Sequence, residues 1–413
     1  MRVLILSQYF WPESFSINQL AATLREQGAE VEILTAKPNY PDGKIYPGYS
    51  AWGCQRDSFQ EMPIHRIPLF PRGTGGFRLA LNYISFVVAG LVFGPWMLRG
   101  TRFDAIFVYA PSPILQAIPA ILLGLIKKCP VVLWVQDLWP DSLSATGYIR
   151  SPLILAAIRE LVRWIYRQVD LILVQSEAFR EPVAELAGDV SKIAFFPNGV
   201  EAKLLENPIP SAAVECLAAA MGGCFSVLFA GNLGSAQALD TILDAAAILR
   251  DEASIRLFLV GTGNQFDLLK ARIRDENLSN VEMPGRFSRE DMTLLFKNAS
   301  VLLASLRDDQ VFDRTIPSKI QSYMMAGKPI IASLNGEGAR IIQLAGAGLS
   351  CPAEDPQALA ETIRKLSTLP DHVRLAYGQS ARQYAVENFS LDLLAVRFSR
   401  LLSNLQTTVK SDP

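Results

Sequence analysis

A serine and a lysine directly follow a proline at the start of a predicted helix, and this combination could hold an anion. The residues are Pro317, Ser318 and Lys319. Proline suits the first position of a helix, and the next backbone N–H groups have no partner within the helix. Together with a lysine side chain, these groups favour a phosphate. An ordinary helix–strand unit would show the same pattern, so other residues must decide between the two interpretations.

Three loops with small or basic residues follow apolar segments earlier in the same half of the chain. They contain Gly231 with Gly234, Gly261 with Gly263, and Arg286 with Phe287. Glycine lets a phosphate or a sugar approach the backbone N–H groups closely, although it also simply turns a strand into a helix. Together with the helix that starts at Pro317, these loops predict a nucleotide-type pocket.

The pocket needs a sheet that brings the loops together, and the surrounding pattern predicts one. In the second half, the expected strands are 227–230, 257–260, a weaker one near 281, 301–304 and 330–332, separated by helices 238–250, 265–276 and 289–298. In the first half, the expected strands are 3–7, 31–35, 106–109, 131–135 and 171–175. Alternating strands and helices indicate an α/β fold with parallel, doubly wound sheets, which bind ligands beyond the carboxyl ends of their strands.

The length of 413 residues exceeds one typical domain, so we expect two. The regular pattern of the first half ends near residue 200. The expected division is therefore 1–200, 201–390, and a C-terminal helix and tail over 391–413. A net charge of −1 argues against a general nucleic-acid binder.

Cysteine and histidine usage favours neither a metal nor a redox site. The five cysteines are scattered and the two histidines lie outside any motif, so we expect no metal and a reducing cytoplasm. The chain opens on a predicted buried strand, without the basic lead of a signal peptide.

Two long loops and one acidic segment are the candidate functional residues of the first half. The loop over 8–16 contains Glu13, Ser14 and Ser16, and a second loop covers 37–48. Asp137 follows the strand at 131–135 and could orient a hydroxyl group or take its proton, or could merely cap a turn. Trp139 could stack on a sugar or pack in the core.

One segment of the first half suggests a membrane surface. Residues 79–98 carry no charge and are flanked by Arg78 and Arg99. The length approaches that of a membrane span, but a span would separate the first two strands from the rest. We therefore expect an amphiphilic or partly buried helix, with an apolar core helix as the alternative. Arg159, Arg163 and Arg167 share one helical face, which suits anionic lipid.

Several of these motifs, taken together, resemble the retaining glycosyltransferases of family 4. They are Tyr-Phe-Trp-Pro-Glu at 9–13, Gln-Asp-Leu-Trp-Pro-Asp at 136–141, Pro-Asn-Gly-Val at 197–200, Gly-Asn-Leu-Gly at 231–234, Gly-Thr-Gly at 261–263, Pro-Ser-Lys at 317–319 and Tyr-Met-x-Ala-Gly-Lys-Pro-Ile-Ile at 323–331. The most similar subgroup builds bacterial O-antigen and capsule polysaccharides and includes fucosaminyl and other deoxysugar transferases. The resemblance implies a GT-B fold of two Rossmann-like domains, a nucleotide diphosphate sugar as donor, no metal, and a C-terminal helix that returns to the first domain.

The resemblance also implies roles for individual residues. The residues expected at the donor's diphosphate are Gly231, Asn232 and Gly234. Those expected at the phosphates or the transferred sugar are Pro317, Ser318 and Lys319. Those expected at its nucleoside are Gly261, Gly263, Arg286 and Phe287. Asp137 stands at the acidic position of the family's His-Asp pair, with Gln136 where the histidine often stands.

Five departures from the family pattern affect the donor site. Arg314 and Ser322 stand where many members carry two glutamates; serine can still hydrogen-bond a hydroxyl group, but arginine cannot accept. Asn232 and Gln237 stand where many members carry arginine and lysine, and the usual Gly-Gly of the first loop is missing. We therefore expect Lys319, Arg314, Arg286 or helix N-termini to balance the diphosphate charge.

The implied function is retaining transfer of a hexosyl or N-acetylhexosaminyl group to a lipid-linked saccharide acceptor, at the inner face of the cytoplasmic membrane. Lys319 would stabilise the leaving phosphate, and Asp137 would serve the acceptor. Two alternatives remain open: a GT-B-fold sugar-nucleotide epimerase, and a catalytically weak scaffold of a polysaccharide assembly complex.

Overall fold

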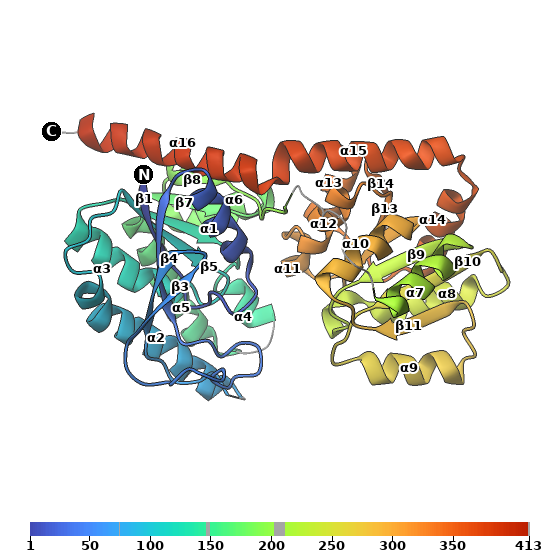
Figure 1. Cartoon of the computed structure of the whole chain (residues 1–413), viewed down its shortest axis with the longest axis horizontal. Coiled ribbons are helices and arrows are strands. Elements are labelled where there is room, and N and C mark those ends of the chain that lie inside the picture. Colours follow the sequence, from blue (N-terminus) through green and yellow to red (C-terminus); the bar gives the residue numbers. More distant parts are fainter. Residues whose placement is uncertain (74, 146–148, 202–210, 412–413) are drawn as a thin grey trace. The chain divides into compact units, whose positions relative to one another are not determined.

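The computed structural model describes residues 1–411 except 74, 146–148 and 202–210. The chain forms two compact units (Figure 1), unit 1 over Met1–Gly199 with Leu391–Pro413 and unit 2 over Val200–Ser390. Residues 202–210, just after the expected domain boundary, and 412–413 of the expected tail lie outside the described residues. Each unit has a largely parallel sheet between helices, as the alternating pattern predicted.

Unit 1 contains an eight-stranded sheet of order β3-β4-β2-β1-β5-β6-β7-β8. The strands are β1 (Arg2–Leu6), β2 (Glu30–Ala36), β3 (Gln55–Phe59), β4 (Met62–Ile67), β5 (Ala105–Ala110), β6 (Val131–Val135), β7 (Leu171–Val174) and β8 (Ile193–Phe195). All neighbours run parallel except the β3–β4 hairpin. The central strands are buried throughout because helices cover both faces of the sheet.

The helices of unit 1 divide between those two faces. They are α1 (Ser16–Glu26), α2 (Gly76–Met97), α3 (Ala117–Lys127), α4 (Asp141–Ala145), α5 (Pro152–Gln168), α6 (Arg180–Ala187) and α16 (Leu391–Ser411). The cores show that α1 and α16 cover one face, whereas α2, α3, α5 and α6 cover the other. The expected return of the C-terminal helix is visible at Phe398, whose ring centroid lies 4.4 Å from that of Phe107 in β5.

Unit 2 contains a six-stranded parallel sheet of order β11-β10-β9-β12-β13-β14. The strands are β9 (Phe225–Ala230), β10 (Ile255–Val260), β11 (Val281–Gly285), β12 (Val301–Ser305), β13 (Ile330–Ser333) and β14 (Gly348–Cys351). This order reverses direction between β9 and β12, which creates a topological switch point. Ligands of doubly wound sheets bind at such points.

The helices of unit 2 also cover both faces of its sheet. They are α7 (Ala212–Gly222), α8 (Leu239–Ile248), α9 (Phe266–Asp275), α10 (Arg289–Asn298), α11 (Gln310–Asp313), α12 (Ser318–Ala326), α13 (Gly336–Leu344), α14 (Pro356–Thr368) and α15 (Asp371–Phe389). One core contains residues of α7, α10, α12, α13 and α15, and the other contains residues of α8, α9 and α14.

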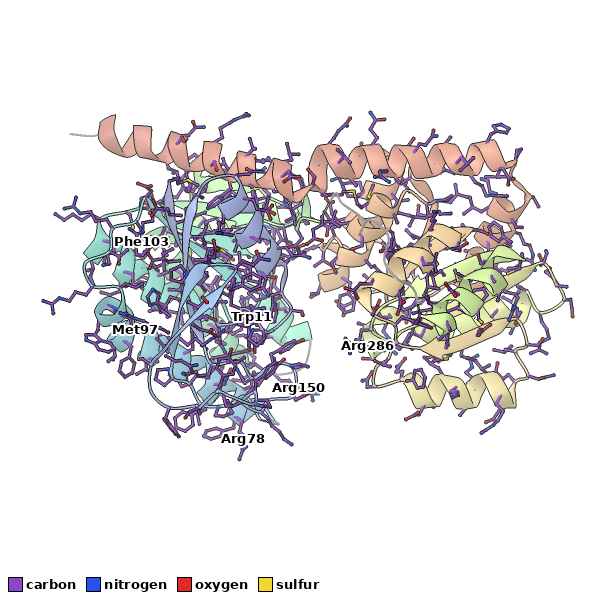
Figure 2. The ribbon with its side chains drawn as sticks, in the orientation of Figure 1. Trp11, Arg78, Met97, Phe103, Arg150 and Arg286 are labelled. Carbon is purple, nitrogen blue, oxygen red and sulfur yellow. The ribbon has the colours of Figure 1, made fainter. Side chains whose placement is uncertain are left out.

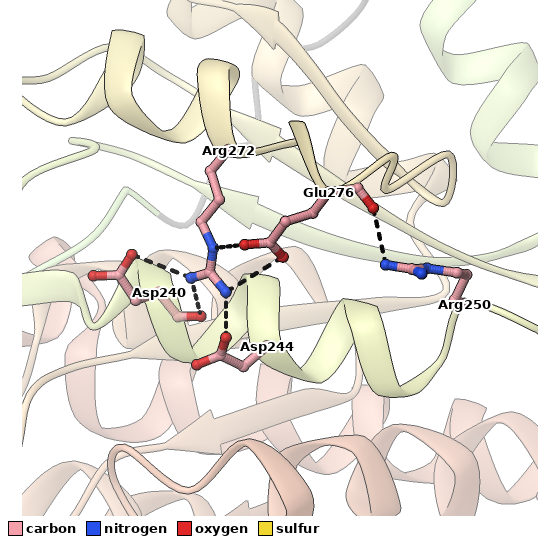
Figure 3. A network of polar contacts seen from close by, with 5 residues as sticks. All are labelled: Asp240, Asp244, Arg250, Arg272 and Glu276. Atoms are coloured by element: carbon pink, nitrogen blue, oxygen red, sulfur yellow. Dashed lines mark hydrogen bonds and ion pairs between the residues drawn. The ribbon is translucent and has the colours of Figure 1, made fainter. Parts of the chain in front are cut away.

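Helix α9 is attached to α8 largely through charge. Its one buried residue is Leu269. Arg272 of α9 forms ion pairs with Asp240 and Asp244 in α8 and with Glu276, the last at 2.6 Å (Figure 3). The hydrogen bond that Arg272 donates to the Glu276 carboxylate, together with the neighbouring carboxylates, raises the pKa of Arg272 above its usual range. The network compensates for the small apolar area that α9 buries.

Helix α12 is attached to the end of β9 by one buried side chain. The Tyr323 hydroxyl group donates to the Ala230 carbonyl oxygen at 3.0 Å and accepts from the Ala230 N–H at 2.9 Å. Both residues are buried. This pair of hydrogen bonds fixes the helix that begins at Ser318 relative to the loop that begins at Gly231.

We predict that Tyr323→Phe destabilises unit 2, because it leaves both buried polar groups of Ala230 without a partner. The expected cost is about 1–3 kcal/mol. All six tryptophans lie in unit 1, so hydrogen exchange of 225–230 and 318–326 is a better measurement than fluorescence. Tyr377→Phe is the matched control, since no hydrogen bond of that hydroxyl group is found among the described residues. Unchanged exchange in Tyr323→Phe would contradict the role of this residue.

Candidate functional site

Unit 2 contains a cavity of about 720 Å³ beside the ends of β9 and β10. It lies at the switch point of the sheet, where the sequence predicted a pocket. The predicted residues that line it are Gly231, Asn232, Gln237, Gly261, Arg286, Phe287, Ser318, Lys319 and Ser322. Arg286 is exposed and is labelled at the end of β11 in Figure 2. The structure therefore brings together loops that are up to 90 residues apart in the sequence.

The glycines of the first two loops have a structural reason beyond ligand contact. Gly231 and Gly261 both have φ of +142°. A Cβ atom on Gly261 would lie 1.8 Å from the Gly231 carbonyl oxygen, and one on Gly263 would lie 2.2 Å from the Leu233 carbonyl oxygen. The two loops thus pack backbone against backbone. A Cβ atom on Gly234 would instead lie 2.6 Å from the Asn232 Nδ2 atom. Neither Gly263 nor Gly234 lines the cavity.

Lys319 is the central cation of the cavity. Its ammonium group lies 3.8 Å from the centroid of the Phe229 ring and donates a hydrogen bond to the Gln237 Oε1 atom. Burial alone lowers the pKa of Lys319 to about 7. No acidic side chain in the described part of unit 2 forms an ion pair with it, so a bound anion would be its counter-charge.

The remaining residues of the predicted anion-binding run differ in their positions. Ser318 opens α12, and the Ser322 hydroxyl group donates to the Ser318 carbonyl oxygen at 3.3 Å. Pro317 takes the N-cap position, one residue before the helix. Pro317 and Arg314 lie outside the lining of the cavity. Arg314 follows α11 instead.

Several lining residues were missed by the sequence analysis. They are Val200, Glu201, Ala230, Val260, Thr262, Met292, Thr293, Phe296, Tyr323 and Met325. Met292, Thr293 and Phe296 share one face of α10, because residues three and four apart are neighbours on a helix. This spacing is visible in the sequence, but which helix faces the switch point depends on the topology.

Asp137 and Trp139 follow β6 in unit 1 and are not among the residues that line this cavity. Burial raises the pKa of Asp137 above its usual range, although neighbouring polar groups oppose the shift. Trp139 is buried and lies against Tyr83, with 6.3 Å between ring centroids. Of the two alternatives left open by the sequence, packing in the core therefore describes Trp139 better than stacking on a sugar.

The first loop of unit 1 is held by a buried carboxyl group. The Glu13 Oε1 atom accepts from the backbone N–H groups of Asn39 and Tyr40, each at 2.7 Å. Burial raises the pKa of Glu13 to about 7, although these N–H groups oppose the shift. Glu13 thus connects the two long loops. The Ser16 hydroxyl group lies 3.0 Å from that of Tyr109, and Ser14 is exposed.

Metal ligands do not cluster in the part of the chain that the structure describes. No group of three or more His, Cys, Asp or Glu side chains there could hold a metal ion.

Two protein families match the chain, one in each unit. Residues 15–199 match the glycosyl transferase 4-like domain, and residues 224–368 match the glycosyl transferases group 1. Together the two matches cover most of the chain.

Relatives and solved structures agree with these matches. The chain is 25% identical over 403 residues to WcaI of Escherichia coli, described as a colanic acid biosynthesis glycosyl transferase, covering 94% of this chain and 97% of that protein. It is 25% identical over 304 residues to the Pseudomonas aeruginosa glycosyltransferase WbjE, covering 73% and 75% of the two chains. The fold resembles Anabaena HepE in complex with UDP, with TM-score 0.70, 16% identity and coverage of 98% and 100%. Sucrose-phosphate synthase from Thermosynechococcus elongatus has TM-score 0.73, 16% identity and coverage of 98% and 99%.

The family matches support glycosyl transfer as the class of activity, and the two relatives are glycosyltransferases. The chain therefore combines a two-domain GT-B-like fold with a match to the glycosyl transferase 4-like domain over 15–199 of unit 1 and to the glycosyl transferases group 1 over 224–368 of unit 2.

Proposed function

We propose that the protein is a retaining, metal-independent glycosyltransferase of O-antigen or capsule biosynthesis. It moves a hexosyl or N-acetylhexosaminyl group from a nucleotide diphosphate sugar to a saccharide acceptor. The observation that carries this proposal is the enclosed ammonium group of Lys319 in the cavity at the switch point. The similarity to HepE, which is solved with UDP and with UDP and glucose, supports a nucleotide sugar as donor.

Charge explains how the cavity would assist the reaction. As the glycosidic bond to the phosphate breaks, negative charge develops on the leaving β-phosphate. A cation fixed beforehand in a site of low polarity stabilises that charge far more than a cation in water. The ammonium group of Lys319 meets this requirement, and the N–H groups at the start of α12 add positive potential.

We assign the acceptor to unit 1. Asp137 would orient the acceptor hydroxyl group or take its proton; it follows β6 at the same edge of the parallel sheet as the loops that Glu13 connects. We further propose that the acceptor is lipid-linked and that the protein acts peripherally on the inner face of the cytoplasmic membrane. The apolar helix α2 supports this location, since it is long enough to interact with a bilayer and only 28% of its apolar window is buried.

The proposed function is tested with a panel of UDP-, GDP- and TDP-sugars in buffer containing EDTA. We expect one nucleotide class to stabilise the protein by about 2.7 kcal/mol at a concentration near 100 Kd. Label from the matching sugar should then move to a lipid extract. Label that stays on the nucleotide would favour an epimerase, and binding without turnover a scaffold. Binding that requires added Mn²⁺ or Mg²⁺ would contradict metal independence.

We predict that donor affinity depends on pH through Lys319. The protonated form binds the diphosphate, and its pKa in the free protein is about 7. The Kd of the nucleotide should therefore rise with pH above about 7, by up to about tenfold per pH unit. Calorimetric titration measures it. In Lys319→Ala the affinity should be weak and independent of pH, whereas Lys328→Ala, a half-buried lysine just after α12, should behave as the wild type.

We also predict that Asp137→Asn lowers turnover by roughly 10²–10⁴-fold while nucleotide affinity stays unchanged. The reason is that Asp137 belongs to unit 1, whereas the cavity belongs to unit 2. Steady-state kinetics and calorimetry measure the two quantities, with Asp141→Asn as control in the same segment. An equal loss of nucleotide affinity would move Asp137 to a donor-binding or structural role.

A further inference from the structure

The outer face of α2 is apolar and exposed. Its exposed side chains are Phe77 (83% exposed), Ile84 (54%), Val88 (54%), Val92 (59%) and Trp96 (65%). The last four recur every fourth residue, so they form one broad stripe along the helix. A contiguous apolar surface of this kind commonly marks an interaction site.

The stripe continues onto neighbouring elements at both ends of α2. Near its start, the exposed rings of Trp52 and Phe70 lie 5.2 Å apart, and the Phe70 N–H donates to the Ser85 hydroxyl group of α2 at 3.0 Å. Near its end, Leu125 and Ile126 of α3 are also exposed. We call these side chains, together with the stripe, the α2 ridge.

The segment that carries α2 is predominantly basic. Between Glu61 and Asp137 the sequence contains a single acidic residue, Asp104. The exposed basic residues of this segment are Arg78, Arg99, Arg102 and Lys128, whereas Arg72 is half-buried and its guanidinium carbon lies 5.4 Å from the centroid of the Tyr40 ring. Arg78 lies near the start of α2, whose end is marked by Met97 in Figure 2. An apolar surface with basic ends is complementary to an anionic lipid leaflet.

The inner face of α2 keeps the helix in unit 1. Asn82 is fully buried; its Oδ1 atom accepts from the Gln8 Nε2 group and its Nδ2 group donates to the Phe70 carbonyl oxygen, each at 2.6 Å. A Cβ atom on Gly90 would lie 2.8 Å from the Pro119 Cβ atom, so α2 and α3 are in close contact. Crossing a bilayer would break these contacts. The helix is therefore suited to lie in the plane of the membrane surface.

The basic face of α5 is a weaker candidate for contact with anionic lipid than the sequence indicated. Arg159 forms an ion pair with Glu185 at 3.3 Å, and Arg163 forms one with Glu160. Two of the three predicted arginines are thus partly neutralised within unit 1. The basic side chains near the ends of α2 are therefore better candidates than those of α5 for contact with lipid phosphates.

We propose that the α2 ridge inserts into the headgroup and outer acyl region of an anionic lipid bilayer. Asn82 links α2 to the two candidate acceptor loops, since it accepts from Gln8 at the end of β1 and lies 3.4 Å from the Asn39 Oδ1 atom of the second loop. Membrane contact would therefore bring those loops to the lipid surface, where a lipid-linked acceptor lies. The inference about the acceptor rests on the proposed function. The inference that the α2 ridge contacts lipid is independent of that function.

The test uses the full chain with vesicles of phosphatidylcholine, alone or mixed with phosphatidylglycerol. We expect vesicle binding to rise with the fraction of anionic lipid and to fall with salt concentration. Brominated lipid should quench the fluorescence of Trp96, and this quenching should be weaker in Trp96→Phe. Val88→Ser/Val92→Ser/Trp96→Ser should reduce binding by roughly tenfold or more. Arg78→Ala/Arg99→Ala should reduce it several-fold, on anionic vesicles only.

The matched control places the same kind of change on unit 2. Leu268, Leu344 and Leu375 are each about as exposed as Trp96, at 63%, 61% and 63%. Leu268→Ser/Leu344→Ser/Leu375→Ser should leave vesicle binding unchanged. An equal loss in this control would show that binding depends on general surface apolarity, which would overturn the role of the α2 ridge.

Other outcomes would also overturn the proposal. The proposal is wrong if the wild-type protein binds neither kind of vesicle. It is also wrong if the triple variant Val88→Ser/Val92→Ser/Trp96→Ser binds vesicles as tightly as the wild type. A ridge variant that converts a dimer to a monomer in light scattering would show that a second copy of the chain covers the ridge. Nucleotide binding is measured on each variant as a check on folding. Failure of the wild type to bind any nucleotide would contradict the proposed function and leave the vesicle result standing.

Discussion

The geometry of the unit 2 cavity depends on the pair of hydrogen bonds between the Tyr323 hydroxyl group and the backbone of Ala230. They join the helix that carries Lys319 to the strand end from which the first glycine loop starts. Because two hydrogen bonds meet at one rigid side chain, the lysine is held beside Gly231 and Phe229 before any ligand arrives. A cation positioned in this way loses little conformational entropy when it meets an anion, which is the usual advantage of a preorganised site.

Two cations of unit 2 show how surroundings decide the role of a charge. Arg272 is surrounded by three carboxylates and holds two helices together. Lys319 has an amide oxygen and an aromatic face beside it, which leave its charge available. The first arrangement completes an electrostatic interaction within the fold. The second leaves room for a ligand to complete the interaction, and this difference supports the cavity as the proposed donor site.

The sequence predicts the α/β architecture well because the central strands are uninterrupted apolar runs, which buried parallel strands require. It does not predict β3, β4, β8 or β14. Of these, Gln55–Phe59 and Gly348–Cys351 lack that pattern. In the site, Gly231 and Lys319 follow from local motifs. The contribution of Met292 and Phe296 depends on topology, and the pairing of Lys319 with Gln237 joins residues 82 positions apart. Likewise, the arginines of α5 look free in the sequence because Glu185 comes close to Arg159 only after folding.

The chain leaves unit 1 at Gly199 and returns to it at Leu391, so unit 2 is an insertion within unit 1. The core of unit 1 includes Leu394, Phe398 and Leu402 from α16, whereas unit 2 takes all of its residues from 200–390. During synthesis on the ribosome, the second unit therefore has its complete set of core residues before the first does. Until α16 leaves the exit tunnel, the N-terminal unit has only α1 on that face of its sheet, and the part that α16 covers stays exposed.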